Sequence, residues 1–291
     1  MHFIDAKSIL SAQNGMNLYR GCMHGCIYCD SRSVCYHIDH AFEDVAVKQN
    51  APGLLERVLG RKREKCMIAT GSMCDPYMPC EQELQLTRKC LEIIERHGFG
   101  ATVLTKSDLV LRDLALLKKI NEKSKCVVQM TLTTYDEALC RLLEPNVCTT
   151  RRRYEALKIF QQEGVPTVAW LCPVLPFIND TPENLKGILE YCFDAGVKGI
   201  LTFGMGVTLR EGDREYFYQK LDEHFPGMKQ KYIHAFGLSY ECASPRSCEL
   251  YEIFDRECEK HGVMHSPDDI FKYLQTFPQK QKAEQLSLFD L

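Results

Sequence analysis

Three cysteines lie close together near the N-terminus of the chain, at positions Cys22, Cys26 and Cys29. Three thiolates at this spacing can wrap one cubane iron–sulfur cluster and leave its fourth iron open. Gly21 and Gly25 allow the backbone to turn tightly around a bulky anion of that kind. Because an open iron can bind a further ligand, as an open zinc position does, the loop predicts a cluster that binds a substrate or a cofactor.

Two other kinds of metal site remain open for these cysteines. A structural zinc site would combine Cys29 with Cys35 and a histidine, either His24 or His37, although this spacing is irregular for zinc. A cluster for electron transfer would need a fourth thiolate, and Cys35 is the nearby candidate. Cysteines without any ligand are the least expected reading of a glycine-rich loop.

The elements that must position this loop alternate between strands and helices along most of the chain. Helix signals follow several strands, such as Thr181 and Pro182, which provide an N-cap and a first-turn proline. This alternation favours βαβ units around a parallel sheet. Six strands are too few for a closed barrel, so the expected fold is α/β, a partial (βα)6 TIM-type barrel. The predicted strands lie near residues 16–19, 66–70, 101–104, 127–132, 166–172 and 199–203.

The organisation expected after the sixth strand is helical. The barrel and a helical extension are predicted over residues 1–265, a C-terminal helix over 266–277, and a polar, flexible tail over 278–291. Parallel α/β folds hold their ligands at the carboxyl ends of the strands. The loops that follow strands are therefore where further reactive residues are expected.

The bulk composition narrows the classes of function. The 291 residues carry a formal net charge of −3, so a nucleic-acid contact would have to come from a local patch. No run approaches the roughly 18 apolar residues of a membrane span, and no signal peptide is recognised. The sixteen cysteines are spread along the chain as in a reducing compartment. We expect a cytoplasmic protein without a membrane partner.

The spacing Cys-x-x-x-Cys-x-aromatic-Cys, completed by Tyr28, resembles the signature of the radical S-adenosylmethionine (SAM) superfamily. The preceding Asn-Leu-Tyr-Arg-Gly segment and the later Asp75-Pro76-Tyr77 resemble the branch related to spore photoproduct lyase, over roughly residues 8–265. The resemblance implies an enzyme that uses a [4Fe–4S] cluster to cleave SAM reductively to a 5′-deoxyadenosyl radical. It also implies an electron donor such as flavodoxin or ferredoxin.

The same resemblance implies SAM-binding roles for residues near the ends of several strands. The tyrosine between the second and third cysteines would lie against the adenine, and the loop after the second strand would bind the amino group. A lysine would contact SAM, threonines the ribose or carboxylate, and an arginine suits the carboxylate. The implied cofactor-binding residues are Tyr28, Ser72, Asp75, Lys106, Thr131, Thr133 and Arg153.

One departure from the family pattern concerns the hydrogen donor. In spore photoproduct lyase, a cysteine two residues before the serine of a Cys-x-Ser-Asp stretch returns a hydrogen atom to the product radical. Aligned on Asp75, this chain has Ser72 at the position of that cysteine and Cys74 at the position of the serine. Cys74 is the candidate hydrogen donor, and the exchange weighs against repair of thymine dimers.

The end of the chain, Gln285-Leu286-Ser287-Leu288-Phe289, is similar to the peptide by which bacterial repair and replication proteins dock on the β sliding clamp. Leu288 and Phe289 would fill an apolar pocket, and Gln285 would hydrogen-bond at its rim. The other interpretation is that Leu286, Leu288 and Phe289 fold back onto the barrel. Clamp docking would place the enzyme on DNA.

These observations predict a radical SAM enzyme that acts on DNA or a nucleotide lesion. One alternative is radical SAM modification of RNA, protein or a metabolite. Another, from a different class, is a non-catalytic iron–sulfur adaptor protein.

Overall fold

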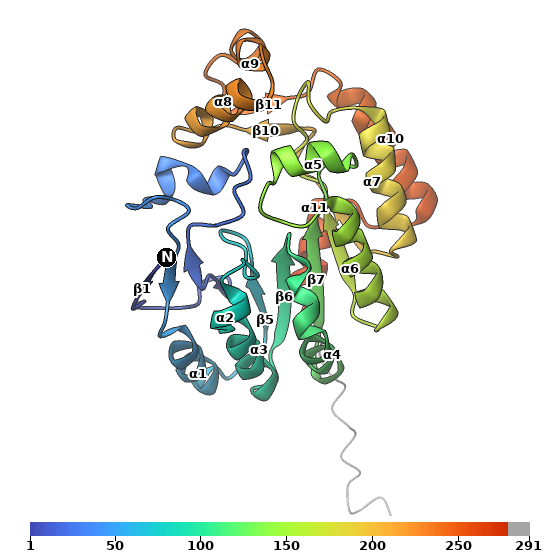
Figure 1. The fold of residues 1–291 in the computed structure, drawn as a ribbon. Helices are drawn as coiled ribbons and strands as arrows, with labels where there is room; N and C mark the ends of the chain where they lie inside the picture. The colour runs from blue at the N-terminus through green and yellow to red at the C-terminus, as the bar shows by residue number, and fades with distance from the viewer. Residues whose placement is uncertain (279–291) are drawn as a thin grey trace, which may run out of the picture.

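The computed structural model describes residues 1–278 of the chain. Its centre is a six-stranded parallel sheet whose strands follow one another in chain order (Figure 1). This sheet confirms the predicted α/β fold, an open, partial barrel. Its strands are β2 (Gly15–Met16), β5 (Met67–Thr70), β6 (Gly100–Thr105), β7 (Cys126–Thr131), β8 (Thr167–Trp170) and β9 (Gly199–Leu201).

Helices connect the successive strands of this sheet. The last of them begins as predicted, with the Thr181 hydroxyl accepting the N–H of Asn184 and Pro182 in the first turn. The connecting helices are α1 (Ala51–Arg61), α2 (Glu81–Leu84), α3 (Leu86–Arg96), α4 (Leu114–Lys123), α5 (Glu137–Leu143), α6 (Thr150–Gln162) and α7 (Pro182–Asp194). Short 3₁₀ helices span Asp30–Arg32, Val34–Tyr36 and Asp108–Asp113.

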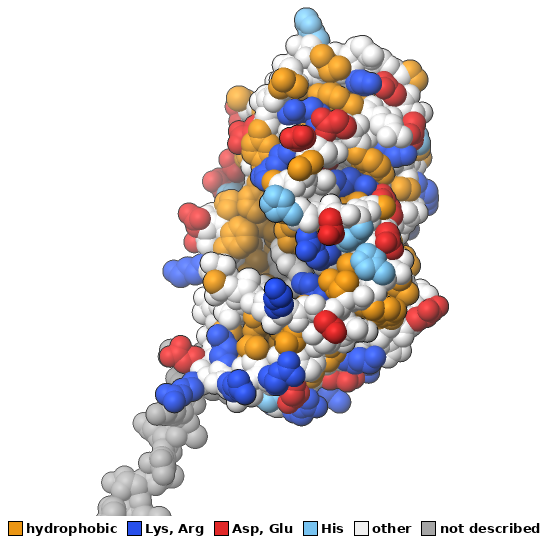
Figure 2. Space-filling model, turned by 90° about the vertical axis from the view of Figure 1, so that its left-hand side faces the viewer, with side chains coloured by type: hydrophobic (Ala, Val, Ile, Leu, Met, Phe, Trp, Pro, Cys, Tyr) orange, Lys and Arg blue, Asp and Glu red, His pale blue; other side chains and the backbone are white. Residues whose placement is uncertain are grey.

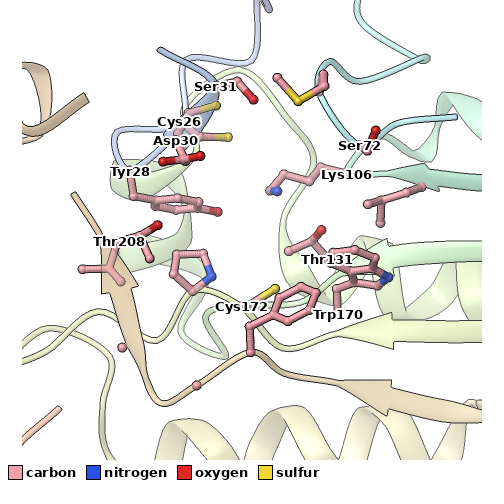
Figure 3. Close-up of a pocket in the computed structure, with 18 of the residues that line it drawn as sticks. Cys26, Tyr28, Asp30, Ser31, Ser72, Lys106, Thr131, Trp170, Cys172 and Thr208 are labelled. Atoms are coloured by element: carbon pink, nitrogen blue, oxygen red, sulfur yellow. The ribbon is translucent and has the colours of Figure 1, made fainter. Parts of the chain in front are cut away.

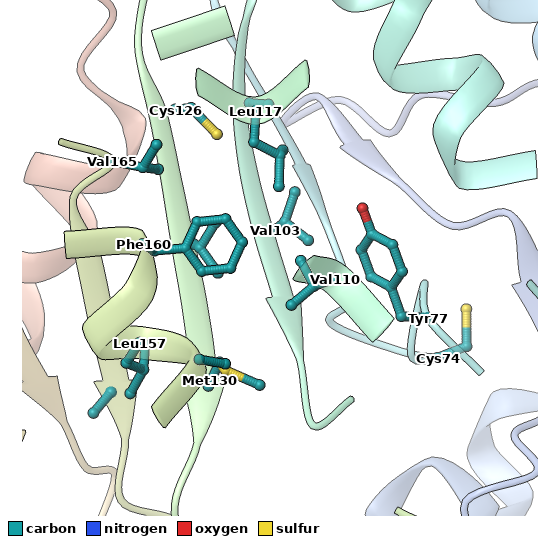
Figure 4. Packing of buried hydrophobic residues seen from close by; sticks show 14 of the residues in the cluster. Cys74, Tyr77, Val103, Val110, Leu117, Cys126, Met130, Leu157, Phe160 and Val165 are labelled. Carbon is teal, nitrogen blue, oxygen red and sulfur yellow. The ribbon is translucent and has the colours of Figure 1, made fainter. Parts of the chain in front are cut away.

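The main core fills the space between the sheet and these helices. Val103 of β6 and Met130 of β7 pack with Leu117 of α4 and Phe160 of α6, all fully buried (Figure 4). Burial of each such side chain contributes roughly 1.5–3 kcal/mol. Four cysteines are buried in this core: Cys90, Cys126, Cys192 and Cys258.

Two small sheets were not predicted. Residues 16–19 were expected as one strand, but β2 joins the large sheet while β3 (Tyr19–Arg20) pairs with β4 (Ala46–Lys48). β1 (His2–Ile4) completes that sheet of three strands. The second small sheet pairs β10 (Gly206–Thr208) with β11 (Glu241–Ala243). Strands of two or three residues carry too little alternation for a pattern to reveal them.

The chain after β9 forms the helical extension. It contains α8 (Asp213–His224), α9 (Met228–Phe236), α10 (Ser247–His261) and α11 (Pro267–Gln275). α11 packs beside the outer strand β9, because Met264 forms a bridge to Gly199 just before the helix begins. Within residues 1–278, no helix is both long and apolar enough to span a membrane.

Candidate active site

The three cysteines near the N-terminus face a cavity of about 660 Å³, lined by the segments that follow the carboxyl ends of the strands. All three line this cavity, and none forms a disulfide. The loop turns at Gly21, whose φ is +86°, and a Cβ there would lie 2.3 Å from the carbonyl oxygen of Phe42. The turn therefore requires glycine, as the sequence predicted.

Burial keeps the thiols of the cysteine loop protonated while no metal is bound. Burial raises the pKa of Cys26 to about 12, although the nearby Lys106 lowers it in part. Burial also raises the pKa of Cys22, and the neighbouring Cys29 raises it further. A coordinating metal would deprotonate these thiols, and the positive charge of Lys106 favours the thiolate of Cys26.

The zinc site and the fourth thiolate find no support in the geometry. Cys35 is exposed, and its Sγ lies 3.3 Å from Nη1 of Arg210. Across residues 1–278, no three side chains of His, Cys, Asp or Glu gather around a position for a single ion. A cubane spreads its thiolates over several iron atoms, so this finding weighs against zinc and leaves the cluster site intact.

Tyr28 is held by a buried pair of charges. Its hydroxyl donates a hydrogen bond to the carboxylate of Glu144. Nη2 of Arg153 lies 2.5 Å from Oε2 of Glu144, and both side chains are fully buried. Burial alone would raise the pKa of Glu144, but Arg153 holds that pKa below its usual value. The guanidinium also donates to the carbonyl oxygen of Thr131 at 3.0 Å.

Two of the residues expected to bind SAM lie behind the cavity wall. Arg153 and Thr133 do not line the cavity. Arg153 is occupied by Glu144, and Thr133 Oγ1 donates to Glu144 at 3.4 Å. Both residues therefore contact Glu144, which in turn holds Tyr28 in the cavity wall. The sequence offered a signal for this network in the Glu144-Pro145 pair, but it could not show that the arginine turns inward.

Asp75 ties the loop after β5 to two other parts of the site. Its Oδ1 accepts hydrogen bonds from Tyr77 N at 2.8 Å and Thr105 Oγ1 at 2.6 Å. Its Oδ2 accepts from Lys106 N at 2.7 Å, and Nε2 of His24 lies 3.0 Å away. Burial opposes ionisation, yet His24 and these donors lower the pKa of Asp75 to about 2. The carboxylate thus fixes the loop to β6 and to the cysteine loop.

Ser72, Lys106 and Thr131 line the cavity, as the resemblance implied for SAM-binding residues (Figure 3). Nζ of Lys106 lies 5.8 Å from the centre of the Tyr28 ring and projects between the two walls. Burial lowers the pKa of Lys106, but nearby acidic groups, led by Cys26, raise it above its ordinary value. The site therefore keeps a positive charge beside the cysteine loop.

The wall opposite the cysteine loop was not predicted. It contains Trp170 at the end of β8, Cys172 after β8, Phe203 after β9, and Tyr251 from α10. Figure 2 shows that one face of the molecule is hollowed, with hydrophobic side chains gathered beside the hollow. Trp170, Cys172 and Phe203 lie at or near the carboxyl ends of the strands predicted over residues 166–172 and 199–203, and this position is the signal that the sequence offered.

A family comparison decides the assignment. The family model of the radical SAM superfamily matches residues 16–184, which contain the cysteine loop, the Asp75 loop and the strands β5 to β8 of the large sheet. The chain belongs to the radical SAM superfamily. Proteins of this superfamily use a [4Fe–4S] cluster and SAM, which confirms the two cofactors predicted from the sequence.

Related sequences occur in other organisms. An uncharacterized protein of Methanocaldococcus jannaschii is 34% identical over 179 residues, covering 61% of this chain and 66% of that protein. An uncharacterized protein of Mycobacterium tuberculosis is 29% identical over 225 residues, covering 75% and 65%. The matches thus span slightly less than two thirds of the length of either relative.

Solved structures share the fold. Spore photoproduct lyase with bound AdoMet and dinucleoside spore photoproduct matches with a TM-score of 0.60 and 13% identity, over 85% of this chain and 74% of that one. Another variant of spore photoproduct lyase matches with a TM-score of 0.63 and 12% identity, over 91% of this chain and 80% of that one. Native anSMEcpe with bound AdoMet matches with a TM-score of 0.53 and 16% identity, over 92% of this chain and 64% of that one. The radical SAM fold is the property that these likenesses establish.

Three cysteines outside the cluster motif line the cavity of this radical SAM protein: Cys74, Cys172 and Cys242. Cys74 and Cys172 border it in different ways. The Sγ of Cys74 donates to the carbonyl oxygen of Tyr19 at 3.2 Å, and its side chain belongs to the main core with Tyr77 (Figure 4). The thiol of Cys172 instead points into the cavity (Figure 3). Cys74 stays a prediction as hydrogen donor, and Cys172 is a second thiol that sequence reasoning missed.

Proposed function

We propose that this radical SAM protein is an enzyme that holds its cluster through Cys22, Cys26 and Cys29 and acts on nucleic acid. The observation that carries the proposal is one cavity that joins the cysteine loop and Lys106 to an open wall of aromatic side chains. A cavity of this size and mixed lining is typical of small-molecule sites. The nucleic-acid substrate is supported by the shared fold of spore photoproduct lyase, whose structure holds a dinucleoside.

When bound, the cluster and SAM together supply one-electron chemistry that removes a hydrogen atom from a substrate. The residues of the chain bind, orient and shield these groups. Tyr28 would lie against the adenine, kept in place by its hydrogen bond to Glu144. Ser72 and the loop fixed by Asp75 would receive the amino group of SAM.

Charge is the second contribution of the chain. Lys106 brings a positive charge to a wall where thiolates and a SAM carboxylate would otherwise be poorly compensated. Thr131 lines the cavity nearby and offers a hydroxyl for the ribose or the carboxylate. The buried pair of Glu144 and Arg153 keeps this wall rigid, because every movement of one charge would leave the other unpaired.

The proposal includes two partners. A low-potential donor such as flavodoxin or ferredoxin would supply the electron. The clamp-binding segment with Gln285, Leu286, Leu288 and Phe289 lies outside the described residues, and its docking on the β sliding clamp remains a prediction. A pull-down with purified clamp, comparing the wild type with a Leu288→Ala, Phe289→Ala double variant, tests it.

The experiment for the substrate class is isotope transfer. The reconstituted, reduced protein is incubated with SAM and either deuterated DNA, deuterated RNA or deuterated cellular protein. We expect deuterium in the 5′-deoxyadenosine from one of the nucleic acids. SAM cleavage with label arriving only from protein, or from none of the three, would contradict the nucleic-acid substrate.

A further inference from the structure

Three aromatic rings meet at the carboxyl ends of the last two strands of the large sheet. The ring centres of Trp170 and Phe203 lie 5.6 Å apart with the planes at 71°, and both residues line the cavity. Phe271 of α11 lies behind them, 6.0 Å from Phe203 and 6.4 Å from Trp170. Nε1 of Trp170 donates to Oε1 of Gln129 at 2.8 Å, so the indole is fixed in orientation.

The turn after β9 holds Phe203 outward. The hydroxyl of Thr202 donates to the carbonyl oxygen of Gly204 at 3.2 Å and accepts the N–H of Gly204 at 3.3 Å. Gly204 has a φ of +147°, a conformation that favours glycine. Phe203 stands at the tip of this closed turn and is 62% exposed. The local backbone thus presents an apolar ring to the cavity mouth, with a second ring supporting it.

The charges of the cavity indicate what such a surface binds. Among the described residues that line the cavity, Lys106 is the one lysine or arginine, and it lies beside the cysteine loop. The other polar groups of the lining include Glu241, Thr208 and Ser247, none of which is a cation. A phosphate would meet no cation at this wall, whereas a flat, uncharged ring would find an aromatic face and hydrogen-bonding groups for its edge.

We propose that Trp170 and Phe203 form a platform on which a nucleobase stacks, facing the cysteine loop across the cavity. This inference rests on the proposed function, since it names the part of the nucleic acid that enters the site. Stacking suits any base because every base has an aromatic face. The base could come from single-stranded DNA, from RNA or from a free nucleoside, and the phosphates would stay outside the cavity.

The platform carries its own reporter, because the chain contains a single tryptophan, Trp170. We would follow its fluorescence in the reconstituted protein during titration with oligothymidylate, oligouridylate and free thymidine. Quenching identifies base binding, and the probe that quenches at the lowest concentration identifies the source of the base. A phenylalanine-containing peptide serves as the comparison ligand.

Substitutions at Phe203 test the stacking itself. Phe203→Ala should weaken binding by about 5- to 150-fold, the range for loss of one base–aromatic contact. Phe203→Tyr, which keeps a stacking face, should bind as the wild type does. The matched control is Phe3→Ala, which removes a phenylalanine of β1 that is 53% exposed and does not line the cavity; its binding should be unchanged.

The platform is overturned if no nucleobase quenches Trp170, if only the peptide does, or if Phe203→Ala binds as tightly as the wild type. The proposed function is tested separately, by measuring the 5′-deoxyadenosine that the same wild-type preparation forms from SAM. Cleavage of SAM without base binding defeats the platform alone. Base binding without any cleavage of SAM defeats the proposed enzyme and leaves the platform standing.

Discussion

The two walls of the cavity are built in opposite ways. On the wall of the cysteine loop, Asp75 receives three hydrogen bonds and Glu144 is paired with Arg153, all buried. On the aromatic wall, Phe203 is mostly exposed and rests on other rings without a polar contact of its side chain. The first wall is held by groups that cannot be left unpaired, and the second is held by a short turn.

The contrast separates what is common in this fold from what selects a substrate. Buried charges and tight glycines fix a surface for cofactors that a whole superfamily shares. Substitution of an exposed ring changes the stability of the fold little, so the residue at this position can vary with the ligand that is bound. Substitutions on the first wall should therefore destabilise the protein, while those on the second should change binding and leave stability almost intact.

The largest effect is expected from Glu144→Ala. It leaves the guanidinium of Arg153 buried without its partner, which typically costs about 3–5 kcal/mol. Urea unfolding at equal cofactor loading measures the free energy. The control is Glu163→Ala, which breaks the exposed pair with Lys118, where N and O lie 2.9 Å apart, and should change stability little. Equal effects of the two variants would contradict the role of the buried pair.

Two glycines with positive φ, one on each wall, allow the same comparison of stability at the level of the backbone. Gly71 follows β5 with a φ of +103°, and a Cβ would lie 1.9 Å from the carbonyl oxygen of Leu104. Gly71→Ala combines backbone strain and overpacking, each about 1–3 kcal/mol. At Gly204 the nearest atom to a Cβ is the hydroxyl of Tyr251 at 3.9 Å, so Gly204→Ala meets the strain alone. Thermal unfolding should show a larger loss of stability for Gly71→Ala than for Gly204→Ala. The reverse order would contradict the distinction between the two walls.

Asp75 predicts a dependence on pH. Its pKa is about 2, below the ordinary value of 3.8, so its stabilisation is complete above pH 4 and is lost as the pH falls towards 2. This shift corresponds to about 2 kcal/mol. Asp75→Asn should remove that part of the acid-induced loss, measured as unfolding free energy against pH. If the unfolding free energy of the variant fell with decreasing pH as steeply as that of the wild type, groups other than Asp75 would be responsible for the acid-induced loss.

The smallest effect on stability is expected at the aromatic wall. Phe203→Ala removes an exposed ring and should change the unfolding free energy by about 1 kcal/mol or less. Urea unfolding checks this beside the Glu144 variant. A loss as large as that of Glu144→Ala would mean that the ring supports the fold, and the distinction between the walls would fail.

The sequence predicted the parts of the molecule that depend on local pattern. The strands of the large sheet after β2 alternate with helices and lie in apolar runs, so their existence could be read directly. The cysteine loop was recognisable because three ligands for one cluster must lie close together in the chain. Gly21 and Thr181 followed from backbone rules that need no knowledge of the tertiary structure.

The remainder depends on contacts between distant segments. Whether Arg153 faces a ligand or a buried carboxylate is decided by how α6 packs, and the sequence gives no direction for its side chain. Cys74 and Cys172 both follow strands, yet one thiol bonds the carbonyl of Tyr19 while the other points into the cavity. The exposed ring of Phe203 looked like any strand residue until the turn after β9 was seen.

The central claim is that Cys22, Cys26 and Cys29 hold the cluster that activates SAM. Its most direct test is iron content and 5′-deoxyadenosine formation in the anaerobically reconstituted wild type, Cys26→Ala and Cys35→Ala, the last removing an exposed cysteine near the loop. We predict iron and SAM cleavage in the wild type and in Cys35→Ala, and neither in Cys26→Ala. SAM cleavage that survives in Cys26→Ala, or a wild type that binds zinc and no iron, would contradict the claim.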